Sequence, residues 1–383
     1  MVLHKKTRLI AVGDIALNGP YEDLLRQGKA HEVLAGVATV LARADFAIGN
    51  LEGPLTVRPS VGPPWRYCLR GHPDYAPLLR AAGIRVLSLA NNHIMDYGWD
   101  AVEETLSKLM DVGIQSIGAG RNLEAARQPS YVSIRGRVFS FLAYCSVPVG
   151  VHLYATPTEP GVAPARPSYI VEDIRAAKRR SDTLVVCMHW GQEHVHYPIP
   201  SQRRLAREMI AAGANLIIGH HPHVLQGMEC VDGGLVAYSL GNFTFAEEEW
   251  CGVDQKGNQF RTQFRLGEPA RRTALLRLAV NGESGSVSHE VIPAYLRADL
   301  RVVEDPRPER VEELRRYNAT LRKPGYFLIW AAAMLWSRAR VVTTGFFPER
   351  ALLWKRLRRL RPRHVLDLAR LLAREWEQLR GLE

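Results

Sequence analysis

The segment Leu216-Ile217-Ile218-Gly219-His220-His221-Pro222-His223 carries the pattern that decides the fold. Its short, β-branched apolar run is typical of a buried strand, and the glycine and histidines directly after it mark the strand's end. Five other segments share this format, in which Gly, Asp, Asn, Glu or His follows the apolar run at once: residues 9–12, 46–48, 86–90, 184–188 and 235–240. The sequence therefore predicts six buried strands whose ends carry polar side chains.

Helix-like stretches lie between these strands, at residues 101–112, 168–180 and 201–212. Alternating strands and helices predict an α/β fold. Loops that leave the carboxyl ends of strands in such sheets converge on one crevice, so we expect the polar strand ends to meet. Residues 273–280 and 287–296 predict a late hairpin, which would make the sheet system mixed.

The positive charge is concentrated in the last part of the chain. The formal net charge is +11, from 50 Lys and Arg against 39 Asp and Glu. From Arg301 onward there are 19 basic and 10 acidic residues, a net of +9, which leaves +2 for residues 1–300. With a linker near residues 304–308, this predicts a body at 1–300 and a basic helical extension at 301–383.

Residues 354–363 of this extension alternate apolar residues with arginines. A helix of that kind can lie on an anionic membrane surface or dock on a partner, or it can be a solvated helix packed on its own domain. No nucleic-acid-binding motif accompanies the charge, so we expect no nucleic-acid partner. The longest apolar stretch, residues 326–336, is too short to span a bilayer, and no signal peptide is recognisable. We therefore expect a cytoplasmic chain, peripheral at the membrane at most.

The polar strand ends together predict a metal centre. Asp, Glu, Asn and His offer a mixture of oxygen and imidazole ligands that suits Mn, Fe or Zn, as one or two ions. Each residue alone is weak support, because a single histidine after a strand is usually structural. Gathering so many ionisable groups without a cation would be costly, which favours metal binding. The five cysteines show no C-x-x-C spacing and predict neither a disulfide framework nor a cysteine zinc site.

Two short motifs predict separate roles in metal binding and proton transfer. In Asn92-His93, the amide oxygen can complete a metal shell while the adjacent imidazole protonates a leaving group. Asp96, three residues later, either orients that imidazole or caps the helix that begins near residue 99. In His221-Pro222-His223, residues two apart in an extended segment would point to the same side and hold one or two ions.

The ordered series of motifs resembles the capsule-biosynthesis protein CapA family, which includes poly-γ-glutamate synthesis proteins. The motifs are Gly-Asp at 13–14, Asn-Leu-Glu at 50–52, Ala-Asn-Asn-His-x-x-Asp-Tyr-Gly at 90–98, Gly-Ala-Gly-Arg-Asn-Leu at 118–123, His-Trp-Gly-x-Glu at 189–193, Gly-His-His-Pro-His-Val-Leu-Gln at 219–226 and Tyr-Ser-Leu-Gly-Asn-Phe at 238–243. That family is similar to the calcineurin-like metallophosphoesterases. The resemblance implies an α/β fold, namely a metallophosphoesterase-like four-layer α-β-β-α sandwich, here followed by the C-terminal helical extension.

The resemblance also implies roles for individual residues. The metal ligands would be Asp14, Glu52, Asn92, His189, His221 and His223, and His93 would donate a proton to the leaving oxygen. Asp96 is counted as catalytic with His93 on the spacing given above, not on the resemblance. Phosphoesterases follow the first Asp with x-His, whereas Ile15 and Ala16 follow Asp14 here and cannot bind a metal. Glu193, His194 or His196 could compensate, although a polar surface strand is the alternative. Substrate contacts are assigned to Asn50, Trp190, Glu193 and Asn242, with packing beside the site as the alternative for Trp190.

Two functions fit these residues. The first is a divalent-metal-dependent, phosphoesterase-type hydrolase linked to capsule or poly-γ-glutamate biosynthesis, with a phosphate-containing or polyglutamate-type substrate. The second is a non-catalytic assembly factor that binds a metal or a polymer and docks on a membrane or partner through its basic tail. Turnover of a phosphate diester with Mn would distinguish the two.

Overall fold

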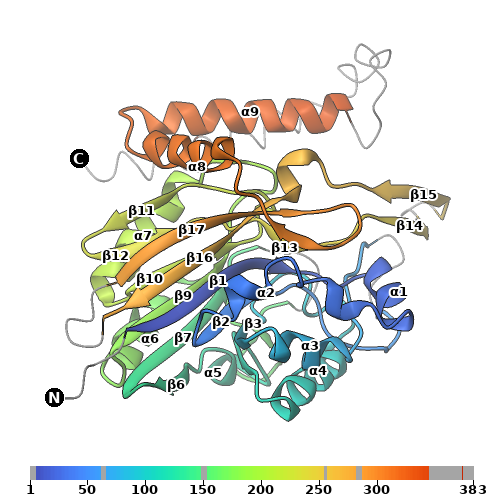
Figure 1. The fold of residues 1–383 in the computed structure, drawn as a ribbon, viewed down its shortest axis with the longest axis horizontal. Coiled ribbons are helices and arrows are strands. Elements are labelled where there is room, and N and C mark those ends of the chain that lie inside the picture. The colour runs from blue at the N-terminus through green and yellow to red at the C-terminus, as the bar shows by residue number, and fades with distance from the viewer. Residues whose placement is uncertain are drawn as a thin grey trace.

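Two β-sheets lie face to face in the structure (Figure 1). The computed structural model describes residues 6–61, 66–147, 153–253, 257–281 and 287–344, together with residue 373. Aromatic rings join the sheets, because Phe46 of β2 (Phe46–Leu51) packs edge-on against Phe139 and Phe141 of β7 (Arg137–Cys145), with centroids 5.6 and 5.9 Å apart. The body is therefore a sandwich with an apolar core between its sheets.

The first sheet is mixed. Its order in the described residues is β18-β17-β16-β1-β2-β3-β4, and β13 pairs with β1 beside this path. β1 to β4 run parallel, whereas β16, β17 and β18 are antiparallel. The remaining bounds are β1 (Thr7–Ile15), β3 (Ile84–Ser88), β4 (Gln115–Ile117), β13 (Asn242–Thr244), β16 (Arg272–Val280), β17 (Val287–Leu296) and β18 (Val302–Glu304). The predicted late hairpin is confirmed as β16 and β17.

The second sheet has the order β11-β12-β10-β9-β7-β6. Its four central strands are parallel and its two edge strands are antiparallel. The bounds are β6 (Ser130–Ile134), β9 (Thr183–His189), β10 (Leu216–His220), β11 (Met228–Val231) and β12 (Gly234–Ala237). All six apolar runs singled out in the sequence are buried strands or strand ends of these two sheets, so that prediction is confirmed.

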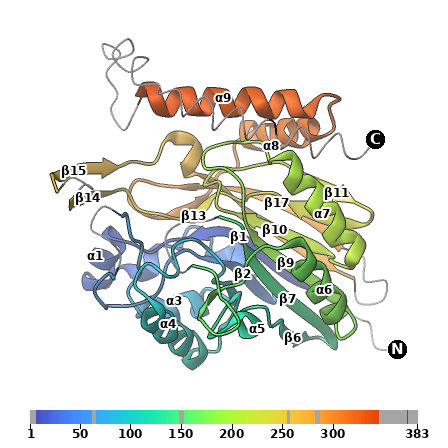
Figure 2. The ribbon, with the colours of Figure 1, turned by 180° about the vertical axis from the view of Figure 1, so that it is seen from behind.

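Helices cover the outer faces of both sheets. α3 (Tyr75–Ala81) and α4 (Trp99–Asp111) contact β3 and β4, and α4 buries Ala101, Thr105 and Leu109 at helical spacing. α6 (Pro167–Lys178) and α7 (Pro200–Ala212) pack on the second sheet, where their apolar faces meet the outward-facing side chains of β9 and β10. The result is the expected order of four layers, α-β-β-α (Figure 2).

Smaller elements complete the described chain. They are α1 (Pro20–Arg26), the 3₁₀ turn η1 (Ala30–Glu32), α2 (Ala38–Leu41), β5 (Ala119–Gly120), α5 (Leu123–Ala126), β8 (Gly161–Val162), β14 (Glu248–Val253), β15 (Gln259–Phe264) and the 3₁₀ turn η2 (Glu268–Arg271). β14 and β15 form a separate antiparallel hairpin, which projects from the body at the end where α1 lies in both views (Figures 1 and 2).

Two helices follow β18. α8 (Pro308–Leu321) contacts β11 and β17, and α9 (Tyr326–Thr344) contacts α7, with Trp330 and Met334 fully buried in the core beneath it. The division at residue 300 stays a prediction, while the described part of the extension packs on the body. The basic segment 354–363 lies outside the described residues. A search of the described helices finds none long and apolar enough to cross a membrane.

Candidate metal centre

The carboxyl ends of strands from both sheets meet at one point. Asp14 lies near the end of β1 and Glu52 directly after β2, while His189 and His220 end β9 and β10. The Oδ1 atom of Asp14 is 3.2 Å from Nδ1 of His220, although 206 positions separate them in the chain. The convergence expected from parallel strand ends is therefore observed.

The first sheet supplies the acidic half of this cluster. The Asn50 side-chain amide donates to Oδ1 of Asp14 at 2.9 Å and to Oε2 of Glu52 at 3.4 Å. Asn91 holds Asn50 in turn, because its amide donates to Oδ1 of Asn50 at 3.2 Å. Both carboxyl groups are buried, so these amide bonds fix their orientation.

The second sheet supplies the imidazoles. Nε2 of His189 lies 2.7 Å from Oδ1 of Asn92 and 4.0 Å from Oε1 of Glu52. Nε2 of His223 is 3.5 Å from the same Glu52 oxygen, and its Nδ1 is 3.5 Å from Oδ2 of Asp14. The side chains of Glu52, Asn92, His189 and His223, which come from four separate segments, thus meet in one small volume.

The loop after β10 does not have the expected conformation. His221 and His223 have φ angles of +93° and +56°, in the left-handed region, so the segment is not extended. Both side chains nevertheless reach the cluster, because the backbone turns sharply around Pro222. Such strained backbone in non-glycine residues is typical of functional sites.

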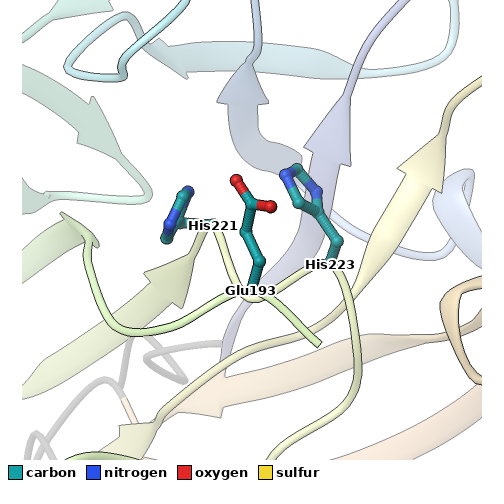
Figure 3. Close-up of side chains that lie close together, drawn as sticks. All are labelled: Glu193, His221 and His223. Atoms are coloured by element: carbon teal, nitrogen blue, oxygen red, sulfur yellow. The ribbon is translucent and has the colours of Figure 1, made fainter. Parts of the chain in front are cut away.

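Glu193 completes a second group with these two histidines (Figure 3). One carboxylate oxygen of Glu193 and one ring nitrogen each of His221 and His223 lie within 4.8 Å of one another, and the same holds for Asp14, Glu52 and His223. His223 therefore belongs to both groups. The expected polar strand at 193–196 is instead a turn, with His194 at a φ of +59°.

His93 and Asp96 form a pair at the edge of the cluster. Nδ1 of His93 is 2.7 Å from Oδ2 of Asp96, which also accepts the Leu69 backbone N–H at 2.8 Å. Arg66 donates to the other Asp96 oxygen at 2.5 Å. Gly98, not Asp96, precedes α4 as its N-cap. Of the two alternatives for Asp96, the geometry matches the one that orients the imidazole.

A cavity of about 330 Å³ opens over the cluster. His93, Asn92, Glu193, His223 and Asn242 line it on the side of the strand ends. Its volume suits a small organic ligand. A substrate in this cavity would lie against His93 and against the candidate ligands Asn92 and His223.

Residues 8–247, which contain every residue of this cluster, match the family described as bacterial capsule synthesis protein PGA_cap. The chain belongs to this family. The CapA resemblance drawn from the motifs is thereby confirmed.

Named relatives of this PGA_cap family member agree with that assignment. It is 35% identical to the PGA biosynthesis protein CapA of Bacillus subtilis over 62% of this chain and 63% of the relative. It is 30% identical to the capsule biosynthesis protein CapA of Bacillus anthracis over 64% and 61% of the two chains. The chain thus spans less than two thirds of the length of these relatives.

Solved structures with a similar arrangement have low sequence identity. One is described as a novel phosphatase from Mycoplasma pneumoniae, with a TM-score of 0.48 and 14% identity over 80% of this chain and 97% of that one. Another is a putative 5'-nucleotidase from Staphylococcus aureus, with a TM-score of 0.46 and 14% identity over 82% and 58% of the two chains.

The donor set of this PGA_cap member fits a divalent cation. Several buried atoms of the cluster have no hydrogen-bond partner in the described chain: Oε1 of Glu52, Nδ1 of His189, both ring nitrogens of His220 and Nδ1 of His221. Buried polar atoms without partners are costly, and mixed oxygen and imidazole donors are ligands of Mn, Fe and Zn. A cation among them would satisfy Glu52 and the imidazoles that face it.

The pKa shifts of Asp14 and the histidines also favour the binding of a cation. Burial, followed by the negative charges of Asp14 and Glu193, raises the pKa of Glu52 well above its ordinary value. Burial also lowers the pKa of His189, and it lowers that of His221 to about 4 although Glu193 opposes it. For Asp14, burial acts to raise the pKa, but His220 and the other histidines outweigh it and hold the pKa low. The neutral imidazoles and the ionised Asp14 are in the protonation states that bind metal, whereas Glu52 would have to give up its proton as a cation binds. Its raised pKa reflects negative charge gathered without a cation.

Three residues with assigned substrate contacts have other neighbours. The prediction that Trp190 contacts substrate is wrong. Its ring is buried against Tyr238, with Nε1 donating to the Tyr238 carbonyl at 3.2 Å, and it packs beside the site. Asn50 is fully buried and holds the carboxyl groups. Asn242 lines the cavity and its Oδ1 is 2.8 Å from Nδ1 of His223. His196, offered as a compensating ligand, stacks on Tyr317 and is within 3.0 Å of the Leu225 carbonyl.

Sequence reasoning missed two residues of the centre. His220 faces Asp14. Its place at the end of β10 is the signal in the sequence that could have identified it as a residue of the centre. Arg66 contacts Asp96 and the Asn92 carbonyl, at 3.2 Å for the latter. Nothing in the sequence around residue 66 indicates that contact, because it depends on how two loops fold together.

Proposed function

We propose that this chain is a divalent-metal-dependent, phosphoesterase-type hydrolase that serves the synthesis of capsule or poly-γ-glutamate. The observation that carries the proposal is the convergence of buried carboxylates and imidazoles beneath a cavity that is also lined by His93, which Asp96 contacts from behind. The link to capsule and poly-γ-glutamate rests on the family and on the names of its relatives.

The residues that would hold the cation are Asp14, Glu52, Asn92, His189, His221 and His223. Glu193 would replace the histidine that phosphoesterases carry after the first Asp, since Ile15 and Ala16 are buried in the apolar core. One oxygen of its carboxylate lies within 4.8 Å of ring nitrogens of His221 and His223, and Asp14, Glu52 and His223 form an adjoining group, so these residues would hold one or two ions. Mn, Fe and Zn are the metals that suit these donors.

When bound, the cation would polarise the phosphoryl group and make water a better nucleophile at neutral pH. The chain's own residues would control proton transfer. His93 contacts Asp96 through Nδ1, so Nε2 is the ring nitrogen left for the substrate. Asp96, held by Arg66 and the Leu69 N–H, fixes this orientation. A protonated His93 would then donate to the departing oxygen, the role of a general acid.

Hydrolysis of bis(4-nitrophenyl) phosphate by the full chain with added Mn tests this proposal. We expect turnover that EDTA abolishes. The His93→Ala variant should lose about a hundredfold to ten-thousandfold in kcat, the usual contribution of general acid catalysis, with unchanged metal content. The His289→Ala variant, which alters an exposed histidine on β17, is the matched control and should keep full activity.

Absence of turnover with this diester and with a γ-linked glutamate polymer, at full metal occupancy, would contradict the hydrolase. That result would favour the second function, an assembly factor that binds metal or polymer without reaction. Equal activity of His93→Ala and wild type would leave hydrolysis standing but remove His93 from its mechanism.

A further inference from the structure

Part of the cavity lining is built from rings. Tyr67, Phe245, Trp250 and Phe264 line it, with Leu266 beside them. Tyr67 stacks on Phe264 with centroids 5.6 Å apart and planes at 21°, and Phe245 is 5.4 Å from Phe264. We call these five residues the aromatic wall.

The β14–β15 hairpin supplies the outer part of this wall. Its side chains alternate: Trp250, Phe260, Thr262 and Phe264 are half-buried on one face, while Glu249, Cys251, Arg261 and Gln263 are exposed on the other. Trp250 lies opposite Thr262, and Glu248 opposite Phe264. Because side chains alternate along a strand, one apolar face of the hairpin is turned toward the cavity.

The hairpin is fixed to the body near the centre. Glu248 accepts a hydrogen bond from the Asn18 amide at 2.8 Å and another from the Tyr67 hydroxyl. Asn18 follows β1, the strand that carries Asp14. The aromatic wall is therefore tied to the same strand end as the candidate metal ligands.

The hairpin also lies outside the part of the chain that defines the family. The family match ends at residue 247, and β14 begins at Glu248. Trp250, Phe264 and Leu266 of the wall therefore lie beyond the matched segment, whereas Tyr67 and Phe245 lie within it. The part supplied by the hairpin can set which substrate reaches the centre.

The charges around the cavity argue against a polyanion. Among its described lining residues, Arg66 is the only arginine or lysine, and it already pairs with Asp96. A γ-linked glutamate chain carries a carboxylate on every residue, and its recognition would need several cations. Aromatic side chains instead favour flat, apolar groups. The Nε atom of Arg66, buried without a hydrogen-bond partner in the described chain, could donate to one anionic group.

We propose that the cavity binds a phosphate ester whose apolar, ring-bearing group packs on the aromatic wall. The substrate class is an aryl or nucleoside phosphate ester, not the polyglutamate chain. This inference rests on the proposed function, because the phosphoryl group would lie at the metal-binding residues and the ring at Trp250 and Phe264.

The test compares the affinities of two non-hydrolysable anions, phenylphosphonate and methylphosphonate, for the Mn-loaded full chain by calorimetry. We expect phenylphosphonate to bind about tenfold more tightly, since ring contacts contribute beyond simple burial.

Phe264→Ala should reduce that preference to about twofold without weakening methylphosphonate binding. Gln263→Ala, on the exposed face of the same strand, should preserve it. Thr262→Trp, which fills the cavity, should weaken phenylphosphonate even if Phe264→Ala does not fold.

Equal affinities in the wild type, or a preference untouched by both Phe264→Ala and Thr262→Trp, would overturn the inference. Tighter binding of a γ-linked glutamate oligomer than of phenylphosphonate would do so as well. Since these measurements require no turnover, they separate the two claims. Hydrolysis without a phenyl preference would leave the proposed function intact, whereas a phenyl preference without hydrolysis would contradict only the proposed function.

Discussion

The acidic and the imidazole halves of the centre come from different sheets and are built differently. On the first sheet, Asp14 and Glu52 are held by the Asn50 amide, at the end of regular parallel strands. On the second sheet, His221 and His223 sit in left-handed backbone, and several ring nitrogens there have no partner in the described chain. The acidic half is thus oriented by an amide of the protein, while Oε1 of Glu52 and several ring nitrogens of the imidazole half are left for a cation that both sheets would hold.

The largest expected effect is on the acidic half. Asp14→Asn keeps the shape but removes the negative charge that faces His220 and His223. We expect Mn affinity to fall about a thousandfold, the loss that one nearby unit charge produces at an intermediate dielectric. Titration calorimetry measures it, with Asp45→Asn, whose carboxylate pairs with Arg135, as the control. Unchanged affinity would mean that Asp14 does not contact the ion.

The imidazole half should make the stability of the metal-free chain depend on pH. In the metal-free chain, the His221 pKa falls from its ordinary 6.5 to about 4, so the unfolded state binds more protons between these values. Stability must then decrease as pH falls through this window. Relative to His221→Asn, wild type should lose about 3 kcal/mol between pH 7 and pH 4.

Urea unfolding of both proteins in EDTA measures this difference in the free energy of unfolding. Because both proteins contain Glu52, whose raised pKa has the opposite effect on stability as pH falls, the comparison isolates the contribution of His221. A stability difference that stays constant with pH would show that His221 is not buried as a neutral imidazole.

A smaller effect is expected outside the two halves, at Asp96. Asp96→Asn should lower kcat about tenfold to a hundredfold, because the amide holds the His93 ring less firmly and in a different protonation state. Metal content should stay unchanged, and the pH profile of kcat should shift. A loss confined to KM would instead indicate a role in binding substrate.

The smallest effect is expected at Glu193, which is exposed and groups with His221 and His223. Because water screens an exposed charge, Glu193→Gln should weaken the binding of one ion about tenfold at most. Two Mn ions held at the adjoining groups should give a coupled electron paramagnetic resonance spectrum in wild type. The variant should give an uncoupled one at Mn concentrations that fill only the tighter site. An unchanged spectrum would leave the missing histidine ligand without a replacement.

The sequence predicted the strands and their meeting point because both depend on local patterns. Apolar runs that end in polar residues identify buried strands, and parallel strand ends must share one edge. The prediction that His221 and His223 lie in an extended segment was wrong. Side chains two residues apart share a face only in extended backbone, and this loop turns. Arg66 and the aromatic wall were missed because their positions depend on contacts between distant loops. Trp190 was misassigned as a substrate contact, since its place directly after β9 does not say whether its ring faces the cavity or packs on Tyr238.

Elemental analysis of the full chain, purified without added metal, shows whether the cluster of carboxylates and imidazoles holds a cation. We expect at least one equivalent of Mn, Fe or Zn per chain. Asp14→Asn should lose this metal, and His93→Ala should retain it. A chain free of transition metal that takes up none on titration would contradict this expectation.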